Sequence, residues 1–263
     1  ARRFATYKRA HLLFTNLERL SALVNRMDRQ PEIGVCSPKV RSYARPEYFE
    51  HAGAGGGLID WFGFPYCQGR VFSTVVPDRG QYDPAQPVFW ASGTSFLIRT
   101  SLYARTGGLD DLFFAHMEEI DLCWRLRSRG RRILCVPQSI VYHVGGATLN
   151  YNSPRKTFLN FRNNLLMLHK NLQQKEYRAV MAVRCLLDYV AAVKFLLTGD
   201  VANCKAVVEA RREFKRVKSG YNTNRKENLQ VTVAEEIPER SCFSILWRYY
   251  ARGCKRFSQI NDD

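Results

Sequence analysis

"GGLDDLFFAHMEEIDLCWRLRSRGRRILCVPQSIVYHVGG", residues 107–146, is the stretch that decides the fold. A glycine turn and an aromatic pair lead into three acids within four positions, and an apolar run follows them. This order predicts a helix over residues 118–129 that ends at Gly130. Two short strands, "RRILCVP" and "SIVYHVGG", are then predicted, bounded by Pro137 and Gly145-Gly146.

The acids have a purely structural interpretation. Glu118, Glu119 and Asp121 fall in the first turn of the predicted helix. Carboxylates in that position are stabilised by the helix dipole, by about 0.3–1 kcal/mol each. Asp121 and Arg125 are also spaced to pair along the helix. The acids can therefore be explained without any chemical role.

A functional interpretation uses the flanking residues. The glycine turn and aromatic pair are placed to deliver the start of the helix into a cleft, where a carboxylate can accept a proton from a hydroxyl nucleophile. His143 comes at the end of an apolar strand, before a Gly-Gly loop. Imidazole binds ions of the Mn²⁺ type, so His143 is a candidate metal ligand.

Composition limits the class of protein. The chain has 263 residues with 46% hydrophobic content, enough for one large domain or one domain plus a helical appendage. The formal net charge of +16 predicts an anionic partner: nucleic acid, an anionic membrane face or a phosphorylated small molecule. Charge alone does not choose among these.

Cysteine usage bears on the compartment. The chain has eight cysteines, and no two stand at CxxC spacing, so a zinc cluster is not predicted. Several lie in apolar runs, where a thiol behaves as a small hydrophobe. We therefore predict reduced thiols and a cytoplasmic location. The start, "ARRFATYKRA", has neither an apolar signal-peptide core nor an initiator Met.

The flanking segments are mostly helical by pattern. A helix is predicted in "NLERLSALVNRMDRQ", and a strand in "VCSPKVRSY". The Gly-rich stretch after it is expected to be a loop region with a hairpin. From Ser153, an N-cap residue followed by Pro154, the apolar spacing turns helical. Residues 177–197 form a second helix, and charged residues within it make it a poor bilayer span.

Two C-terminal segments are basic. Residues 205–218 are expected to form a basic helix that carries Arg211, Arg212, Lys215, Arg216 and Lys218. A solvated face, a membrane-surface face and a nucleic-acid face are its three interpretations. No nucleic-acid-binding motif accompanies it, so no nucleic-acid partner is predicted. Residues 219–263 look loosely structured and end in a basic, aromatic helix.

Three motifs in order resemble a known family. "WASGTSFLIR" (90–99), the stretch 107–146 and "PRKTFLNFRNNLLMLHKN" (154–171) are similar to the C-terminal half of family 2 glycosyltransferases. The rhamnosyltransferase-like group of bacterial surface-polysaccharide enzymes is the nearest match, over about residues 17–175. The resemblance implies an α/β chain: a partial GT-A (Rossmann-like) glycosyltransferase domain followed by C-terminal helices.

The expected domain organisation follows from the same resemblance. Residues 1–30 are an atypical N-terminal remnant with a helix, and residues 31–150 are the acceptor-side part of the GT-A domain. Residues 151–218 form a helical extension, with a membrane-surface role as one interpretation, and residues 219–263 form a basic C-terminal tail. Arg162, Asn163 and Asn164 of the extension are expected to make polar contacts to the catalytic half, with a donor-phosphate contact as the alternative for Arg162.

The resemblance also implies an activity. It is an inverting, metal-dependent transfer of a sugar from a nucleotide-diphosphate sugar to a saccharide or lipid-linked acceptor, in surface-polysaccharide synthesis. Glu119 is the expected base, with Glu118 and Asp121 beside it as catalytic residues. His143 would join a divalent metal, Mn²⁺ or Mg²⁺. The expected substrate-binding residues are Trp90, Ser92, Gly93, Thr94 and Arg125.

The sequence departs from the family pattern in one respect. Relatives carry a preceding nucleotide-binding half with an Asp-x-Asp motif that holds the metal. No Asp-x-Asp occurs in these 263 residues. The alternative is therefore a catalytically incomplete fragment that acts only as an acceptor- or membrane-binding module. A cytoplasmic location, with peripheral attachment to the inner face of the cytoplasmic membrane, is the location expected for either.

Overall fold

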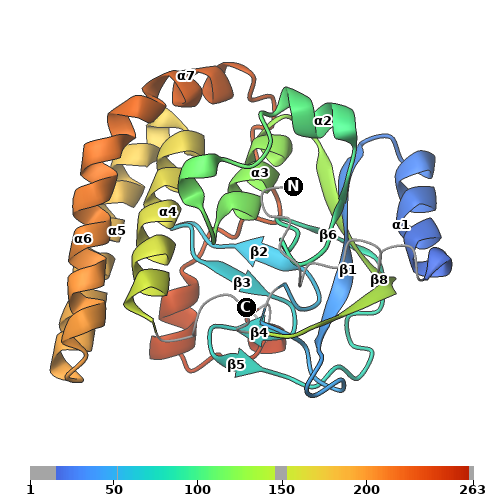
Figure 1. Cartoon of the computed structure of the whole chain (residues 1–263), viewed down its shortest axis with the longest axis horizontal. Coiled ribbons are helices and arrows are strands. Elements are labelled where there is room, and N and C mark those ends of the chain that lie inside the picture. The colour runs from blue at the N-terminus through green and yellow to red at the C-terminus, as the bar shows by residue number, and fades with distance from the viewer. Residues whose placement is uncertain (1–15, 52, 146–152, 261–263) are drawn as a thin grey trace.

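The computed structural model describes residues 16–51, 53–145 and 153–260 (Figure 1). Within them, a central four-stranded sheet has the order β6-β8-β1-β7. Its long strands, β1 (Ile33–Ser42) and β8 (Arg132–His143), run parallel. The short strands β6 (Gln86–Val88) and β7 (Leu97–Ile98) pair antiparallel with them. The predicted α/β class is confirmed.

The prediction of two short strands after the acid-rich helix is wrong. Residues 132–143 form one strand, β8. Its pairing with β1 shifts register where Pro38 pairs with Val136 and Lys39 with Ile140. Pro137 lies in this bulge because it has no backbone N–H to give to the ladder. The proline thus bends the strand without ending it, and His143 stays attached to the main sheet.

A second sheet forms from the segment that the sequence predicts as a loop region with a hairpin. Its strands are β2 (Gly57–Ile59), β3 (Pro65–Cys67), β4 (Arg70–Val71) and β5 (Thr74–Val75), joined as antiparallel neighbours. Gly57 allows the close approach of Trp90, since a Cβ at position 57 would lie 2.2 Å from Cε2 of the indole. The glycines of this stretch therefore serve packing.

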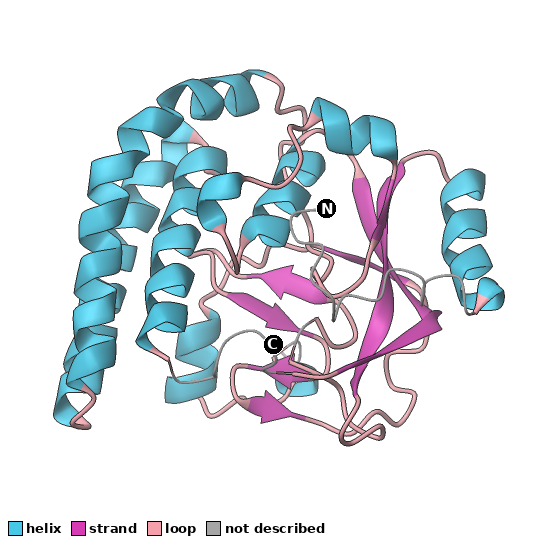
Figure 2. Cartoon of the chain, viewed as in Figure 1, coloured by secondary structure: helices cyan, strands magenta, loops and turns pink. Residues whose placement is uncertain are grey.

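Helices cover the sheets on opposite sides (Figure 2). α1 (Leu17–Arg29) packs on β1 and β8, whereas α4 (Pro154–Asn171), α5 (Gln174–Leu197), α6 (Val201–Val217) and α7 (Asn222–Gln230) gather on the other side. α2 (Thr100–Arg105) and α3 (Glu118–Ser128) lie between these groups. The Ser153 hydroxyl accepts a hydrogen bond from the Lys156 amide at 3.3 Å, which confirms the predicted N-cap of α4.

The C-terminal segment is packed, contrary to the prediction that residues 219–263 are loosely structured. Beyond α7, Ile245, Tyr249 and Ile260 are buried in one apolar cluster with Tyr66 and Val71. The segment includes the π-helical turn Trp247–Ala251. The tail is therefore part of the core under the second sheet.

Asp60 anchors this tail. Its carboxylate is buried and accepts hydrogen bonds from the backbone amides of Phe62, Phe64 and Ile245, at 3.0, 2.7 and 2.9 Å. Burial raises the pKa of the Asp60 carboxyl to about 6, against the opposing effect of these hydrogen bonds. One side chain thus joins the β2–β3 hairpin to residue 245.

Two predictions about the whole chain can be compared with the described residues. All eight cysteines fall within them and are free thiols, as predicted. Over the same residues, no helix is both long and apolar enough to cross a bilayer.

Candidate functional site

The predicted acid pair meets the predicted Ser-Gly loop. Glu118 and Glu119 open α3, and the backbone amide of Gly93 donates a hydrogen bond to the Glu119 carboxylate. A Cβ placed on Gly93 would lie 3.7 Å from Cδ of Glu119. The amides of Glu119 and Ile120 also donate to this carboxylate, as free amides at a helix start can. Gly93 and Glu119, which are distant in the sequence, therefore lie side by side in the candidate site.

The electrostatics of Glu119 favour a bound proton. Burial raises the pKa of the Glu119 carboxyl, and the negative charge of Glu118 raises it further. Oε2 of Glu119 is buried without a hydrogen-bond partner among the described residues. A buried polar atom of this kind needs a ligand or a water molecule. Glu119 is therefore a carboxyl of raised basicity with one oxygen left for an incoming group.

The turn that delivers these acids is strained. Phe114, His116 and Met117 have φ angles of 62°, 69° and 71°, which fall in the left-handed region. Each such residue costs on the order of 1–3 kcal/mol, and the surrounding structure must hold it in place. Strain of this sort clusters at functional sites. The backbone leading into Glu118 is thus set by outside contacts.

α4 supplies those contacts. Nδ2 of Asn163 donates to the carbonyl oxygens of Phe113, Ala115 and His116, each at 2.8 Å. Nη2 of Arg162 donates to the Leu112 carbonyl at 2.6 Å. Nδ2 of Asn164 donates to the Gly63 carbonyl at 2.6 Å. The prediction that these three side chains make polar contacts to the sheet half is confirmed. Asn163 acts as a clamp on the strained turn.

Replacement of Asn163 with alanine should release the clamp. Buried carbonyls that lose their donor cost about 1–3 kcal/mol each, so we expect a loss of at least that size in the free energy of unfolding, measured with urea. Asn224→Ala on α7 is the matched control, because Asn224 is exposed. Equal stability of the two variants would show that the turn holds its shape without Asn163.

His116 lies in this turn. Burial lowers the pKa of its imidazole to about 4, and the positive charge of Lys156 lowers it further. Nε2 of His116 is buried without a hydrogen-bond partner among the described residues. The ring is therefore neutral near pH 7.

The other residues of the predicted loop lie behind Gly93. Trp90 is buried, and its indole N–H donates to the Leu58 carbonyl at 2.9 Å. The Ser92 hydroxyl is also buried and accepts from the Thr94 amide at 3.2 Å. Gly93 is exposed and Thr94 is half-buried. The described contacts thus make Trp90 and Ser92 supports of the loop, with Gly93 at its surface.

Asp121 and Arg125 face the interior. The Asp121 carboxylate is fully buried and accepts from Arg125 Nε at 3.0 Å, Lys170 Nζ at 2.8 Å and Asn171 Nδ2 at 2.8 Å. Arg125 also donates to the carbonyls of Thr106 and Gly108. These bonds fasten α3 to α4 and to the glycine turn. Both side chains are therefore engaged away from the Gly93 surface.

His143 pairs with a residue that sequence reasoning missed. Its Nδ1 lies 2.7 Å from Oε2 of Glu50, which is itself buried. Glu50 directly precedes His51 at the start of the Gly-rich segment. This adjacent pair of an acid and an imidazole was the one feature of the sequence that could have marked Glu50 as a site residue. Its partner stands 93 positions away. The backbone amide of Glu50 donates to the Val40 carbonyl of β1 at 3.1 Å, and β1 pairs with β8, which carries His143.

The loop after Glu50 links the two ends of the site. A Cβ on Gly53 would lie 2.6 Å from Cβ of Ser92, so this loop packs on the Ser92-Gly93 loop. A chain of contacts therefore joins His143 to Glu119: it runs through Glu50, the Gly53 loop and the Ser92-Gly93 loop. Among the described residues, His143 and Glu119 do not touch each other.

Two cations accompany this link. Burial lowers the pKa of His51, and Arg70 and Lys156 lower it further. Lys156 also acts on His116, as described above. Its charge therefore reaches both the Glu50 end and the acid-turn end of the site. Arg70 and Lys156 thus place positive charge near His51.

The metal prediction can be compared with the donor set. Among the described residues, no group of three or more His, Cys, Asp or Glu side chains is arranged to hold a metal ion. Mg²⁺ often takes only one or two protein carboxylates, together with substrate phosphates and water. Glu50 supplies one such carboxylate, with Nδ1 of His143 at 2.7 Å from its Oε2.

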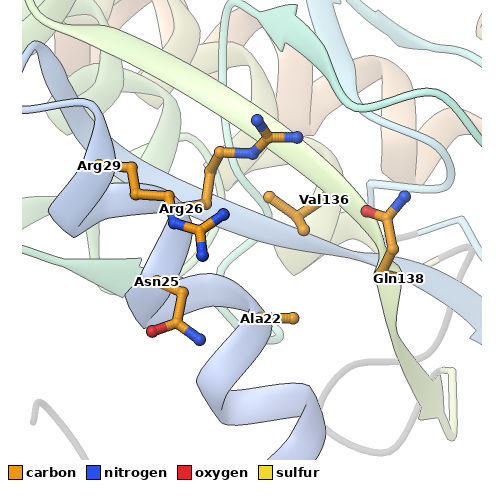
Figure 3. A pocket seen from close by; sticks show the side chains of 6 residues that line it. All are labelled: Ala22, Asn25, Arg26, Arg29, Val136 and Gln138. Atoms are coloured by element: carbon orange, nitrogen blue, oxygen red, sulfur yellow. The ribbon is translucent and has the colours of Figure 1, made fainter.

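A surface pocket lies elsewhere. It has a volume of about 290 Å³ and is formed by α1 and β8 (Figure 3). Arg26 and Arg29 of α1 and Gln138 of β8 are among its lining residues. None of the residues predicted for the site lines it, so it does not mark the acid cluster.

Comparison with known proteins gives partial matches. No family model matches the chain. An N-acetylglucosaminyl-diphospho-decaprenol L-rhamnosyltransferase of Mycobacterium tuberculosis is 28% identical over 131 residues, 47% of this chain and 41% of the relative. The low-salt glycan biosynthesis hexosyltransferase Agl10 of Haloferax volcanii is 26% identical over 158 residues, 53% and 52% of the two chains. Rhamnosyltransferase WbbL of Escherichia coli is 36% identical over 73 residues, 28% and 27%.

These matches agree with the motif-based prediction. The chain spans about half the length, or less, of the curated relatives it matches. All of them are named as sugar transferases. The chain is therefore similar, at low identity and over part of its length, to rhamnosyltransferases and hexosyltransferases of the family 2 type.

Proposed function

We propose that this chain forms the acceptor side of an inverting glycosyltransferase. The donor is a nucleotide-diphosphate sugar, and the acceptor is a saccharide or a lipid-linked saccharide. The observation that carries the proposal is Glu119, a buried carboxyl of raised pKa with one unpartnered oxygen, set beside Gly93. Sugar transfer, as the class of reaction, is inferred from the names of the relatives.

The step needs one base. The acceptor hydroxyl gives its proton to Glu119 as its oxygen forms a bond to the anomeric carbon of the donor sugar. The bond from that carbon to the diphosphate breaks at the same time, and its electron pair leaves with the nucleoside diphosphate. Attack from the face opposite the leaving group inverts the anomeric configuration. A base of raised pKa suits this transfer, because proton transfer is efficient when the pKa lies near the working pH.

The remaining predicted residues take supporting roles. Glu118 raises the pKa of Glu119 through its charge. Asp121 and Arg125 position α3, while Trp90, Ser92 and Thr94 position Gly93 at the acceptor surface. Glu50 and His143 would hold a divalent ion together with the donor phosphates. Such an ion would neutralise the charge that develops on the diphosphate leaving group.

The acceptor class rests on a relative. The M. tuberculosis relative is named for transfer of L-rhamnose to N-acetylglucosaminyl-diphospho-decaprenol. We infer a lipid-linked saccharide acceptor of the same general kind for this chain. Transfer to such an acceptor would take place at a membrane surface, with the chain attached peripherally at the inner face of the cytoplasmic membrane.

A second candidate function is binding without transfer. Its motivation is that no Asp-x-Asp occurs in these 263 residues. In that case the chain binds an acceptor or a membrane and no donor.

Calorimetry separates the two candidates. If transfer is correct, UDP- or dTDP-sugars should bind this chain in a manner that depends on Mn²⁺. His143→Ala should then weaken Mn²⁺ binding about tenfold or more, a loss seen even when only an outer-shell partner of a metal site is removed. Glu213→Gln is the control, since Glu213 pairs with Arg216 on the surface of α6. If neither donor binds with or without Mn²⁺, the chain does not transfer sugar by itself.

A further inference from the structure

α5 buries charged residues in its middle and exposes apolar ones. The two charged residues between Arg178 and Lys194 are Arg184 and Asp188, and each is only 1% exposed. A helix on the surface of a water-soluble domain normally turns its apolar stripe inward and its charges outward. The exposed face of α5 therefore calls for an explanation other than contact with water.

The buried charges are paired with one another. Arg184 pairs with Asp188 at 3.2 Å and donates to the Phe62 carbonyl at 3.0 Å. Arg211 of α6 pairs with the second oxygen of Asp188. These bonds fix the rotation of α5 about its own axis. The opposite side of the helix is consequently held outward.

That outward side is a continuous apolar stripe, which we call the α5 face. Its members recur at spacings of three and four residues and are exposed, Leu186 by 66% and Leu197 by 82%. It consists of Val183, Leu186, Tyr189, Val190, Val193, Leu196 and Leu197. Figure 1 shows α5 beside α6 in the helical layer, away from the sheets. Contiguous exposed apolar surface of this kind marks an interaction site.

One end of the α5 face is aromatic and cationic. Nζ of Lys194 lies 5.2 Å from the ring centroid of Tyr250, so the C-terminal π-helical turn abuts the end of α5. Trp247 and Tyr250 of that turn are exposed. Lys255 lies 5.3 Å from the same ring, and both Lys255 and Arg256 are exposed. Aromatic residues beside Lys and Arg are typical of the boundary between lipid and water.

The positive charge of the chain favours an anionic bilayer over a second copy of the chain as the partner of this surface. The chain carries a formal charge of +16, and cations stand at the end of the α5 face. A second copy would carry the same charge, so repulsion opposes self-association through this region. An anionic bilayer offers negative headgroups to the cations and acyl chains to the apolar stripe.

We propose that the α5 face, together with the turn Trp247–Ala251, docks on an anionic lipid bilayer with α5 parallel to its surface. This contact lies on α5, whereas a membrane-surface face was one of three interpretations of the basic helix at residues 205–218. On α6, Arg211 is buried against Asp188, and Arg216 is paired with Glu213. The proposal does not depend on sugar transfer, because it concerns lipid binding alone.

Co-sedimentation with vesicles tests the proposal. The chain should bind vesicles of phosphatidylcholine mixed with phosphatidylglycerol, bind pure phosphatidylcholine more weakly, and lose binding as salt rises. Leu186→Glu should weaken binding about tenfold or more, because a buried leucine contributes that much to partitioning. Leu17→Glu is the matched control, since Leu17 on α1 is 64% exposed and lies on the other side of the sheet. Circular dichroism should show that both variants fold.

Three outcomes would overturn the proposal. The first is no binding of the unmodified chain to the anionic vesicles. The second is an equal loss in Leu186→Glu and Leu17→Glu. The third is a chain that does not bind vesicles but forms a dimer in analytical ultracentrifugation, which Leu186→Glu dissociates. A second copy would then cover the α5 face.

Discussion

Replacement of Glu119 with glutamine is expected to reduce sugar transfer by about 10²–10⁴-fold, the usual contribution of a general base. The amide keeps the size of the side chain but cannot take a proton from the acceptor hydroxyl. The fold should persist, because the carboxyl is held by backbone amides that the glutamine oxygen can also accept from. Turnover of the nucleotide-sugar donor is the measurement, with donor binding recorded alongside it.

Two further variants make the Glu119 result specific. Glu118→Gln removes the neighbouring charge and should lower the pKa of Glu119, so that transfer falls less and its pH profile shifts to lower pH. Glu213→Gln on α6 should leave transfer unchanged. In the unmodified chain, transfer should rise with pH to a midpoint well above the ordinary range for a glutamic acid, since only the ionised carboxylate accepts a proton. Full turnover by Glu119→Gln would remove Glu119 from the mechanism.

Replacement of Asp121 with asparagine is expected to cost about 3–5 kcal/mol in the free energy of unfolding at pH 7. The change leaves Arg125 and Lys170 buried without their shared carboxylate, although Lys170 keeps its contact with Asp110. Urea unfolding measures the loss. Glu213→Gln is again the control, because an ion pair at the surface adds little to stability.

The loss should depend on pH with a definite sign. Burial opposes the ionisation of Asp121, but Arg125, Lys170 and Asn171 outweigh it and hold the pKa of the carboxyl below its ordinary value of 3.8. The stabilisation is therefore complete above that value and disappears as pH falls through the lower folded pKa. The unmodified chain and Asp121→Asn should converge in stability in strong acid. A difference that stays constant down to pH 2 would show that the charge of Asp121 is not its source.

Local signals in the sequence were sufficient for α3 and α4, but not for α7, which lies in the segment predicted to be loosely structured. Ser153 and Pro154 mark the start of α4, and Gly130 marks the end of α3, because caps and breakers act within one turn of the residue that carries them. The acids could be assigned to a first turn on the same grounds. The family resemblance assigned Glu119 and Gly93 to one site, but their contact was not predicted, since no spacing rule joins residues from separate elements.

Predictions failed where the deciding contact is distant in the sequence. Pro137 looks like a strand end, but pairing with β1 carries β8 through it as a bulge. The tail was predicted to be loosely structured, but it is held by the hydrogen bond from the Ile245 amide to Asp60, 185 positions away. Glu50 was missed for the same reason. Each case depends on tertiary pairing, which patterns in a short window do not contain.

The contact between Asn163 and the strained turn limits how this architecture can recombine. One amide on the helical side dictates the backbone of the segment that presents the acids on the sheet side. A chimera that joins the first part of one transferase to the second part of another would separate the two whenever its crossover falls between residues 113 and 163. Exchange of specificity between relatives should therefore succeed with crossovers outside that interval, where turn and clamp are inherited from one parent.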